Sequence, residues 1–190
     1  MKRILLFSVL SIFCLTISAQ NWIQLGNDMN GTVAGYNNAQ YASLSADGHT
    51  VAVGAPKNSD VGTWVGQVRV FSYDGSSWTQ KGSEINGEAE NDFSGPVGLS
   101  ADGNTVAIGA PQNDGAGDNF GNVRIFDFDG SNWTQRGASI PGETLNGQSG
   151  HSVGISADGN RVVIGSPFYT ESGQAPKGQV RVFIGMAVRG

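Results

Sequence analysis

Short runs of hydrophobic residues, separated by glycine-rich turns, follow one another along most of the chain. The runs are rich in Val, Ile, Phe and Trp and alternate with small or polar residues, which is typical of β-strands. Beyond residue 20, no stretch keeps a helical hydrophobic period over the length that a helix needs. The pattern therefore predicts an all-β protein.

These runs belong to a unit that occurs three times. The tetrapeptide Ser-Ala-Asp-Gly begins at Ser45, Ser100 and Ser156, so the copies are 55 and 56 residues apart. Each copy leads into a strand that ends in proline, which is Pro56 in the first unit. Because proline cannot donate to a strand ladder, it marks the end of the strand and the start of a longer loop.

Each unit is predicted to form four antiparallel strands. Asp-Gly steps supply the turns, because Asp can hydrogen-bond its own backbone and Gly accepts a positive φ. Four strands per repeat at this period predict β-propeller-type blades. We place the units at about residues 32–85, 86–140 and 141–185 of a repeat domain covering 21–190. That division gives about three blades and hence an incomplete or oligomer-completed propeller.

The repeated motif resembles the FG-GAP repeat. The resemblance rests on the run Ser-Ala-Asp-Gly-Asn-Thr-Val-Ala-Ile-Gly-Ala-Pro from Ser100 and on the later Trp-Thr-Gln strand at Trp133. The Phe-Gly half is represented by Phe93-Ser94-Gly95, and the other units lack the Phe. The resemblance covers about residues 22–185. It implies a propeller of the kind that the family forms in integrin α subunits and in bacterial surface and secreted proteins.

Residues 1–20 are predicted to be a secretory signal peptide. A basic start precedes an apolar run from Ile4 to Ile17, and Ser18-Ala19-Gln20 supplies a small-residue exit. The run is shorter than the roughly twenty residues that span a bilayer, so we expect cleavage and no membrane span afterwards. The only cysteine, Cys14, lies inside this run. A mature chain without disulfides favours a bacterial envelope, cell-surface or secreted location.

Residues 21–31 are predicted to be an orphan fourth strand. Trp22-Ile23-Gln24-Leu25-Gly26 matches the later strands at Trp78 and Trp133, whereas the third unit has no such strand after Ile184. We therefore expect this segment to complete a third blade, either within the chain or in a second copy. The second arrangement would be a homo-oligomer formed by strand exchange, which covers sheet edges that otherwise invite aggregation. The alternative is that the chain is a fragment of a longer protein.

The charge balance excludes two classes of partner. The chain has 11 Lys and Arg against 16 Asp and Glu, a net charge of −5. Nucleic acids and anionic membrane surfaces both need clustered basic residues, which the scattered Lys and Arg do not provide.

The resemblance makes calcium the cofactor to consider, since integrin-type repeats carry loops with several Asp residues. The turns here carry one carboxylate each, Asp47, Asp102 and Asp158, which is too few for a cation that takes six to eight oxygen ligands. We assign these residues to turn structure and expect no cofactor at them. Asp114 and Asp118 form a separate, weaker candidate for a cation site, with a solvated acidic loop as the alternative.

No set of residues predicts catalysis. Gly150-His151-Ser152-Val153-Gly154 matches Gly-x-Ser-x-Gly, but that motif needs a strand-to-helix turn and this run is predicted to be a strand. The two histidines, His49 and His151, occupy different places in their units and predict neither a zinc pair nor a dyad.

Two kinds of residue are candidates for ligand binding. Arg69, Arg124 and Arg181 recur at one strand position, each two residues before a Phe, and could form an anion site. Their recurrence also fits a structural role on those aromatic rings. Trp64 occurs in one unit only, in a loop, where it could stack on a sugar or a partner protein or fold over the sheet edge.

The sequence thus predicts a non-catalytic extracellular or cell-surface binding or scaffold module, with an unknown protein or glycan as its ligand. A carbohydrate-binding, lectin-like propeller is the first alternative. The second is an accessory propeller fragment of a larger secreted enzyme or adhesin. The fold by itself cannot name the ligand.

Overall fold

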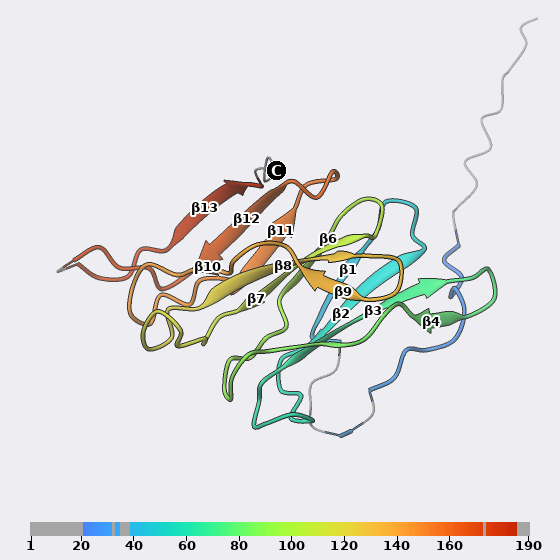
Figure 1. Ribbon diagram of the computed structural model, residues 1–190, viewed down its shortest axis with the longest axis horizontal. Helices are drawn as coiled ribbons and strands as arrows, with labels where there is room; N and C mark the ends of the chain where they lie inside the picture. Colours follow the sequence, from blue (N-terminus) through green and yellow to red (C-terminus); the bar gives the residue numbers. More distant parts are fainter. Residues whose placement is uncertain (1–20, 32, 35–38, 173, 186–190) are drawn as a thin grey trace, which may run out of the picture.

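The computed structural model describes residues 21–31, 33–34, 39–172 and 174–185 as an all-β protein of three antiparallel sheets (Figure 1). The predicted signal peptide, residues 1–20, lies outside the described residues. Across the described part of the chain, no helix has the length and hydrophobicity needed to cross a membrane.

The first two sheets have the same strand order. In sheet I, the path β1-β2-β3-β4 comprises Tyr41–Leu44, Thr50–Ala55, Gln67–Tyr73 and Trp78–Gln80, and β5 (Ile85–Asn86) also pairs with β3. In sheet II, β6 (Val97–Leu99), β7 (Thr105–Ala110) and β8 (Asn122–Phe128) follow one another, and both β9 (Trp133–Gln135) and β10 (Ile140–Pro141) pair with β8.

Sheet III is smaller and consists of β11 (Ser152–Ile155), β12 (Arg161–Ser166) and β13 (Gln179–Ile184). The prediction of four strands per unit is therefore corrected in both directions. Sheets I and II have a short fifth strand, because the chain returns across the start of β3 or β8 as it leaves the sheet. Sheet III has three strands, because no Trp-Thr-Gln segment follows β13.

The turns and strand ends lie where the sequence predicts them. The Ser-Ala-Asp-Gly segments join the first two strands of each sheet, and the long loops begin directly after β2, β7 and β12, at the prolines. Figure 1 shows these turns together at one end of the sheets, at upper right, and the long loops at the other end.

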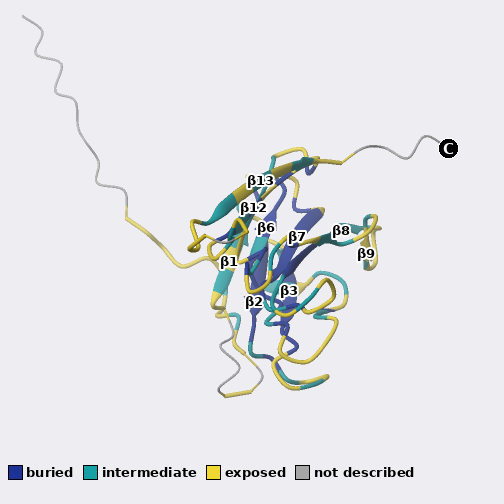
Figure 2. Ribbon diagram, turned by 90° about the vertical axis from the view of Figure 1, so that its left-hand side faces the viewer, coloured by how far each residue is buried: buried dark blue, intermediate teal, exposed yellow. Residues whose placement is uncertain are grey.

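The hydrophobic core lies between successive sheets. Ala52, Val68 and Val70 of sheet I pack against Val106, Ile108 and Phe126 of sheet II. The same positions one unit later, including Ala107 and Val123, pack against Val162, Ile164 and Phe183 of sheet III. Figure 2 shows the result: β2, β3 and β7 are largely buried, whereas β13 lies at the periphery.

The glycine of each Gly-Ala-Pro motif permits this close packing. A Cβ atom on Gly54 would lie 2.0 Å from the carbonyl oxygen of Gly95, and one on Gly109 would lie 2.0 Å from that of Gly150. The backbones of neighbouring sheets therefore approach each other more closely than any side chain allows.

The N-terminal segment differs from its prediction. Residues 21–31 contain no strand and do not pair with β13 of the same chain, so an orphan strand that closes the third sheet within the chain is wrong. The segment packs on sheet I instead: the indole of Trp78 donates to the carbonyl of Leu25 at 2.8 Å, and Met29 contacts the cluster of Val51 and Phe71. Without a neighbouring strand, Trp22 and Ile23 have no ladder to join.

The close approach at Gly109 can be tested by substitution. Gly109→Ala should lower the free energy of unfolding by about 2–3 kcal/mol, because the new Cβ collides with backbone that cannot rotate away. Gly185→Ala is the matched control, since the nearest atom to its Cβ among the described residues would be the Asn160 carbonyl oxygen at 3.7 Å. Urea titration of both variants measures the difference, and equal midpoints would contradict the proposed contact.

Candidate functional site

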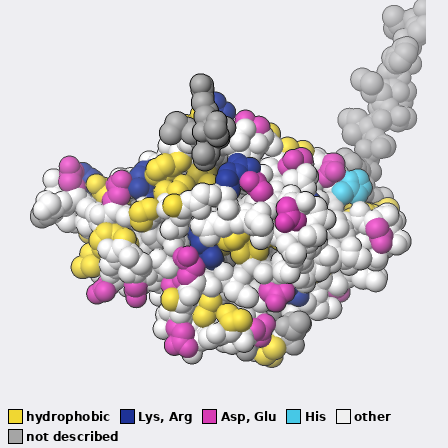
Figure 3. Space-filling model, in the orientation of Figure 1, with side chains coloured by type: hydrophobic (Ala, Val, Ile, Leu, Met, Phe, Trp, Pro, Cys, Tyr) yellow, Lys and Arg dark blue, Asp and Glu magenta, His cyan; other side chains and the backbone are white. Residues whose placement is uncertain are grey.

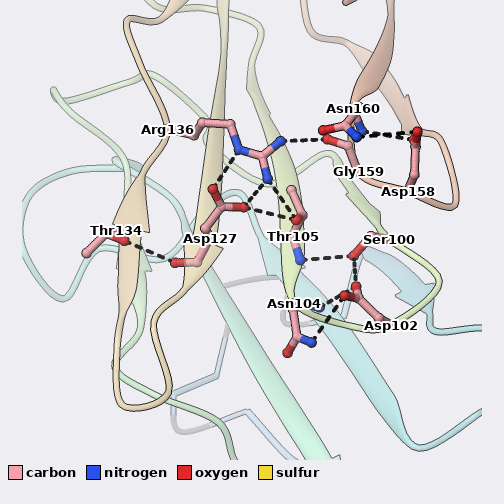
Figure 4. Close-up of polar contacts among 10 residues, drawn as sticks. All are labelled: Ser100, Asp102, Asn104, Thr105, Asp127, Thr134, Arg136, Asp158, Gly159 and Asn160. Atoms are coloured by element: carbon pink, nitrogen blue, oxygen red, sulfur yellow. Dashed lines mark hydrogen bonds and ion pairs between the residues drawn. The ribbon is translucent and has the colours of Figure 1, made fainter. Parts of the chain in front are cut away.

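The three turn aspartates serve the local backbone in the same way. Asp102 accepts a hydrogen bond from the Ser100 hydroxyl at 2.6 Å and one from the Asn104 amide at 3.0 Å (Figure 4). Asp47 repeats these bonds with Ser45 and His49, and Asp158 repeats them with Ser156 and Asn160. The hydroxyl bond holds the pKa of each carboxyl below its ordinary value.

A charged side chain ties the fourth strand of one sheet to the turn of the next. Arg136 makes an ion pair with Asp127, and its Nη1 donates to the carbonyl of Gly159 in sheet III at 2.8 Å (Figure 4). One unit earlier, the Lys81 ammonium of sheet I donates to the carbonyl of Gly103 in sheet II at 2.7 Å. These contacts hold the sheets in register.

The three candidate arginines occupy equivalent places between sheets. Their guanidinium groups lie 5.1–5.3 Å from the rings of Phe71, Phe126 and Phe183 in the same strands. Each also donates to a backbone carbonyl: Arg69 to Asn30, Arg124 to Asn86 and Arg181 to Pro141. The structure thus directs Arg124 and Arg181 to the preceding sheet and Arg69 to the N-terminal segment, and it does not bring the three together.

Asp114 and Asp118 lie in the loop between β7 and β8. The Asp114 carboxylate accepts the Asn119 amide at 2.7 Å, and the Asp118 carbonyl accepts the Asn146 amide at 2.9 Å. Among the described residues, no group of three or more His, Cys, Asp or Glu side chains is placed to hold a metal ion.

Trp64 is exposed and pairs with the half-buried ring of Phe93. It is 44% exposed and its ring centroid is 5.4 Å from that of Phe93, while the ammonium of Lys57 is 6.0 Å from the indole. Trp64 and Phe93 both have positive φ angles, 48° and 53°. The Phe93 amide donates to the Trp64 carbonyl at 3.1 Å, which fixes the two loops to each other.

The aromatic pair interrupts an otherwise repeated arrangement. One unit later, Asn119 and Gln148 hold the same positions, with the same positive φ and the same amide-to-carbonyl bond. The backbone conformation is therefore architectural, whereas the aromatic side chains are particular to the junction between sheets I and II. Trp64 was a candidate from sequence alone, but Phe93 was not. Its signal was the replacement of Phe by Gln in the otherwise matching Phe93-Ser94-Gly95 and Gln148-Ser149-Gly150.

Phe93 also borders a hollow of about 210 Å³ at this loop end of the sheets. Tyr41, Lys57, Gln148 and His151 contribute to its wall. The hollow thus combines two aromatic rings with hydrogen-bonding groups. Ser152, next to His151, begins β11 and pairs with Gly165, so it does not lie on a strand-to-helix turn.

Comparisons with known proteins give the following results. No protein-family model matches the chain, and no curated protein matches it. Among solved structures, hydrazine synthase of Kuenenia stuttgartiensis is 13% identical over 76% of this chain and 34% of its own, with a TM-score of 0.45. TolB of Acinetobacter baumannii is 17% identical over 79% of this chain and 30% of its own, with a TM-score of 0.42. The tricorn protease is 11% identical over 75% of this chain and 13% of its own, with a TM-score of 0.40. The chain thus spans about a third or less of these structures, and likenesses this weak carry no argument about function.

The turn carboxylates predict a loss of stability in acid. Backbone amides of Ser77 and Ser76 lower the pKa of Asp74 from its ordinary value of 3.8 to about 2. A lowered folded-state pKa contributes stability above about pH 4 that is lost as the pH falls toward about 2. We expect the urea midpoint to fall over this range, and to fall less in Asp74→Asn, which carries no charge to lose. Identical pH profiles for the two proteins would contradict this role.

Calcium is expected to have little effect on stability. A site of micromolar affinity would add about 4 kcal/mol at millimolar calcium. Thermal unfolding with and without a chelator measures the effect, and a rise of many degrees on adding calcium would contradict the assignment of Asp47, Asp102 and Asp158 to turn structure.

Proposed function

We propose that the protein is a non-catalytic binding or scaffold module that acts outside the cell or on its surface. The observation that carries the proposal is the exposed Trp64, which stacks on the half-buried Phe93 at the loop end of the sheets. Binding residues are disproportionately found on loops that a rigid scaffold positions, and Trp is among the residues that dominate interface energetics.

The pair is preorganised for recognition. Two hydrogen bonds hold the loops in place without a ligand. The Phe93 amide donates to the Trp64 carbonyl, and the Trp64 amide donates to the Ser59 hydroxyl at 3.0 Å. Binding then costs less conformational entropy than it would for a mobile loop. The predicted signal peptide and the resemblance to FG-GAP repeats, whose propellers occur on surface and secreted proteins, support the extracellular setting.

A lectin-like activity is the second candidate, and the hollow beside Phe93 favours it. Aromatic rings supply a stacking surface for the apolar face of a sugar, and the side chains of Gln148 and Lys57 offer hydrogen bonds to hydroxyl groups. At the junction between sheets II and III, Asn119 and Gln148 stand in place of Trp64 and Phe93. A single sugar site is therefore expected, rather than one at each junction.

The experiment tests both candidates with one pair of variants. The fluorescently labelled protein is applied to a glycan array and to intact cells of the organism that exports it. Trp64→Ala should weaken binding about thirtyfold or more, since an aromatic anchor contributes roughly 2 kcal/mol or more. Phe168→Ala is the matched control, because Phe168 is a similarly exposed aromatic residue on the equivalent loop of sheet III.

Binding to the array assigns a glycan ligand, and binding to cells alone assigns a protein or other surface ligand. Binding that Trp64→Ala leaves unchanged would contradict the proposed site. No binding to either probe would contradict the proposed function.

A further inference from the structure

A tryptophan fills an equivalent place twice, once between sheet I and the N-terminal segment and once between sheets I and II. The indole of Trp78 lies against Gly26 and donates to the Leu25 carbonyl at 2.8 Å. The indole of Trp133 lies against Gly82 and donates to the Lys81 carbonyl at 2.7 Å. In both cases a fourth-strand tryptophan covers the glycine that ends the fourth-strand segment of the preceding unit.

The third such place is open. Gly137 is the counterpart of Gly26 and Gly82, yet a Cβ atom on it would have no neighbour within 4 Å among the described residues. A groove of about 310 Å³ runs beside it, with Arg136, Phe183, Ile184 and Gly185 in its wall. Its position corresponds to that of the tryptophan at the other two junctions.

The edge of sheet III is open as well. Among the described residues, β13 pairs with β12 and with no other strand. One face of the strand is uncovered too: Val180, Val182 and Ile184 are exposed on it, whereas Val68 and Val70, the counterparts of the first two in sheet I, are buried against sheet II. Figure 3 shows hydrophobic side chains gathered on the surface over this strand.

The chain carries a matching free segment at its other end. Trp22 is 94% exposed and Ile23 is 89% exposed, although they correspond to Trp78 and Thr79 of a paired strand. The residues that follow, from Leu25 to Asn30, are already docked on sheet I through the bonds from Trp78 and Arg69. Trp22 is thus held beside sheet I, where a preceding sheet would have to stand.

We propose that the groove at Gly137 and the edge of β13 bind residues Trp22–Gln24 of a second copy of this chain. The register follows from sheet I, where Phe71, Ser72 and Tyr73 face Gln80, Thr79 and Trp78. By equivalence, Phe183 faces Gln24 of the second copy, Ile184 faces Ile23 and Gly185 faces Trp22. The Trp22 indole lies against Gly137 and donates to the carbonyl of Arg136.

The occupant is a copy of this chain because the contact continues two interfaces that the chain already makes. The turns support this continuity: the Ala46 amide donates to the Ala101 carbonyl, and the Ala101 amide donates to the Ala157 carbonyl, both at 3.0 Å. Sheet I of the second copy would extend this row by offering its Ala46 carbonyl to Ala157. Two reciprocal contacts close a ring of six sheets, within the four to eight blades of known propellers.

The first experiment measures molar mass by light scattering across a range of concentrations of the exported protein. We expect a discrete assembly of two copies that Trp22→Ala converts to single chains. Trp64→Ala is the matched control and should leave the mass unchanged, since Trp64 lies at the other end of the sheets. A single chain at all concentrations, or an assembly indifferent to Trp22→Ala, would overturn the proposal.

The second experiment tests the register with cysteine pairs in a Cys14→Ser background. Residues that face each other across antiparallel strands have Cα atoms about 4.5–5.5 Å apart, within the range for a disulfide. Mixing an Ile23→Cys chain with an Ile184→Cys chain should give a cross-linked heterodimer under mild oxidation. Mixing Ile23→Cys with Val180→Cys should not, because the two positions would lie about 13 Å out of register. Equal cross-linking of both mixtures, or an intrachain disulfide in an Ile23→Cys/Ile184→Cys double variant, would overturn the proposal.

Discussion

The structure depends on the close approach of backbone in one sheet to backbone in the next. A Cβ atom at position 54 or 109 would lie 2.0 Å from a carbonyl oxygen of the next sheet. The sheets can therefore pack at this separation only because both residues, Gly54 and Gly109, are glycine. This approach brings β2 over β6 and β7 over β11, and it sets the separation at which the hydrophobic faces interlock. The Gly-Ala-Pro motif is therefore a packing motif. Its glycine allows the neighbouring sheet to approach closely, its alanine is buried at the end of the strand, and its proline begins the loop that follows.

The remaining repeated residues serve the same stacking. The turn aspartates shape the corners, Lys81 and Arg136 reach from one sheet to the next turn, and the arginines beside each Phe bind carbonyls at the sheet junctions. Residues that recur in every unit thus maintain the repeat itself. A binding site is better sought where the repeat breaks, and Trp64 with Phe93 is such a break, because their backbone conformation recurs while their side chains do not.

Much of this organisation could be predicted from the sequence, because each motif acts locally. An Asp-Gly turn, a strand-ending proline and an alternating hydrophobic strand need only their immediate neighbours, and all three lie where the pattern predicts them. Contacts between units could not be predicted in this way. The stacking of Trp64 on Phe93 joins two loops of different units. The packing of residues 25–30 on sheet I depends on which sheet is available to receive this segment. The same reason explains why residues 21–31 do not complete the third sheet within the chain: a segment with strand character forms no strand without a partner.

The contact of a tryptophan with a glycine of the preceding unit is made twice, by Trp78 and by Trp133. Trp22 is an exposed tryptophan beside sheet I, and the groove at Gly137 is a glycine site near sheet III with no tryptophan of the described residues against it. A crystal structure of residues 21–190 tests this account most directly, because it locates the Trp22 indole. The account predicts that the indole lies against Gly137 of a neighbouring copy, with its nitrogen bonded to the Arg136 carbonyl and its strand paired with β13. An indole that remains in solvent, with the groove at Gly137 open, would contradict it.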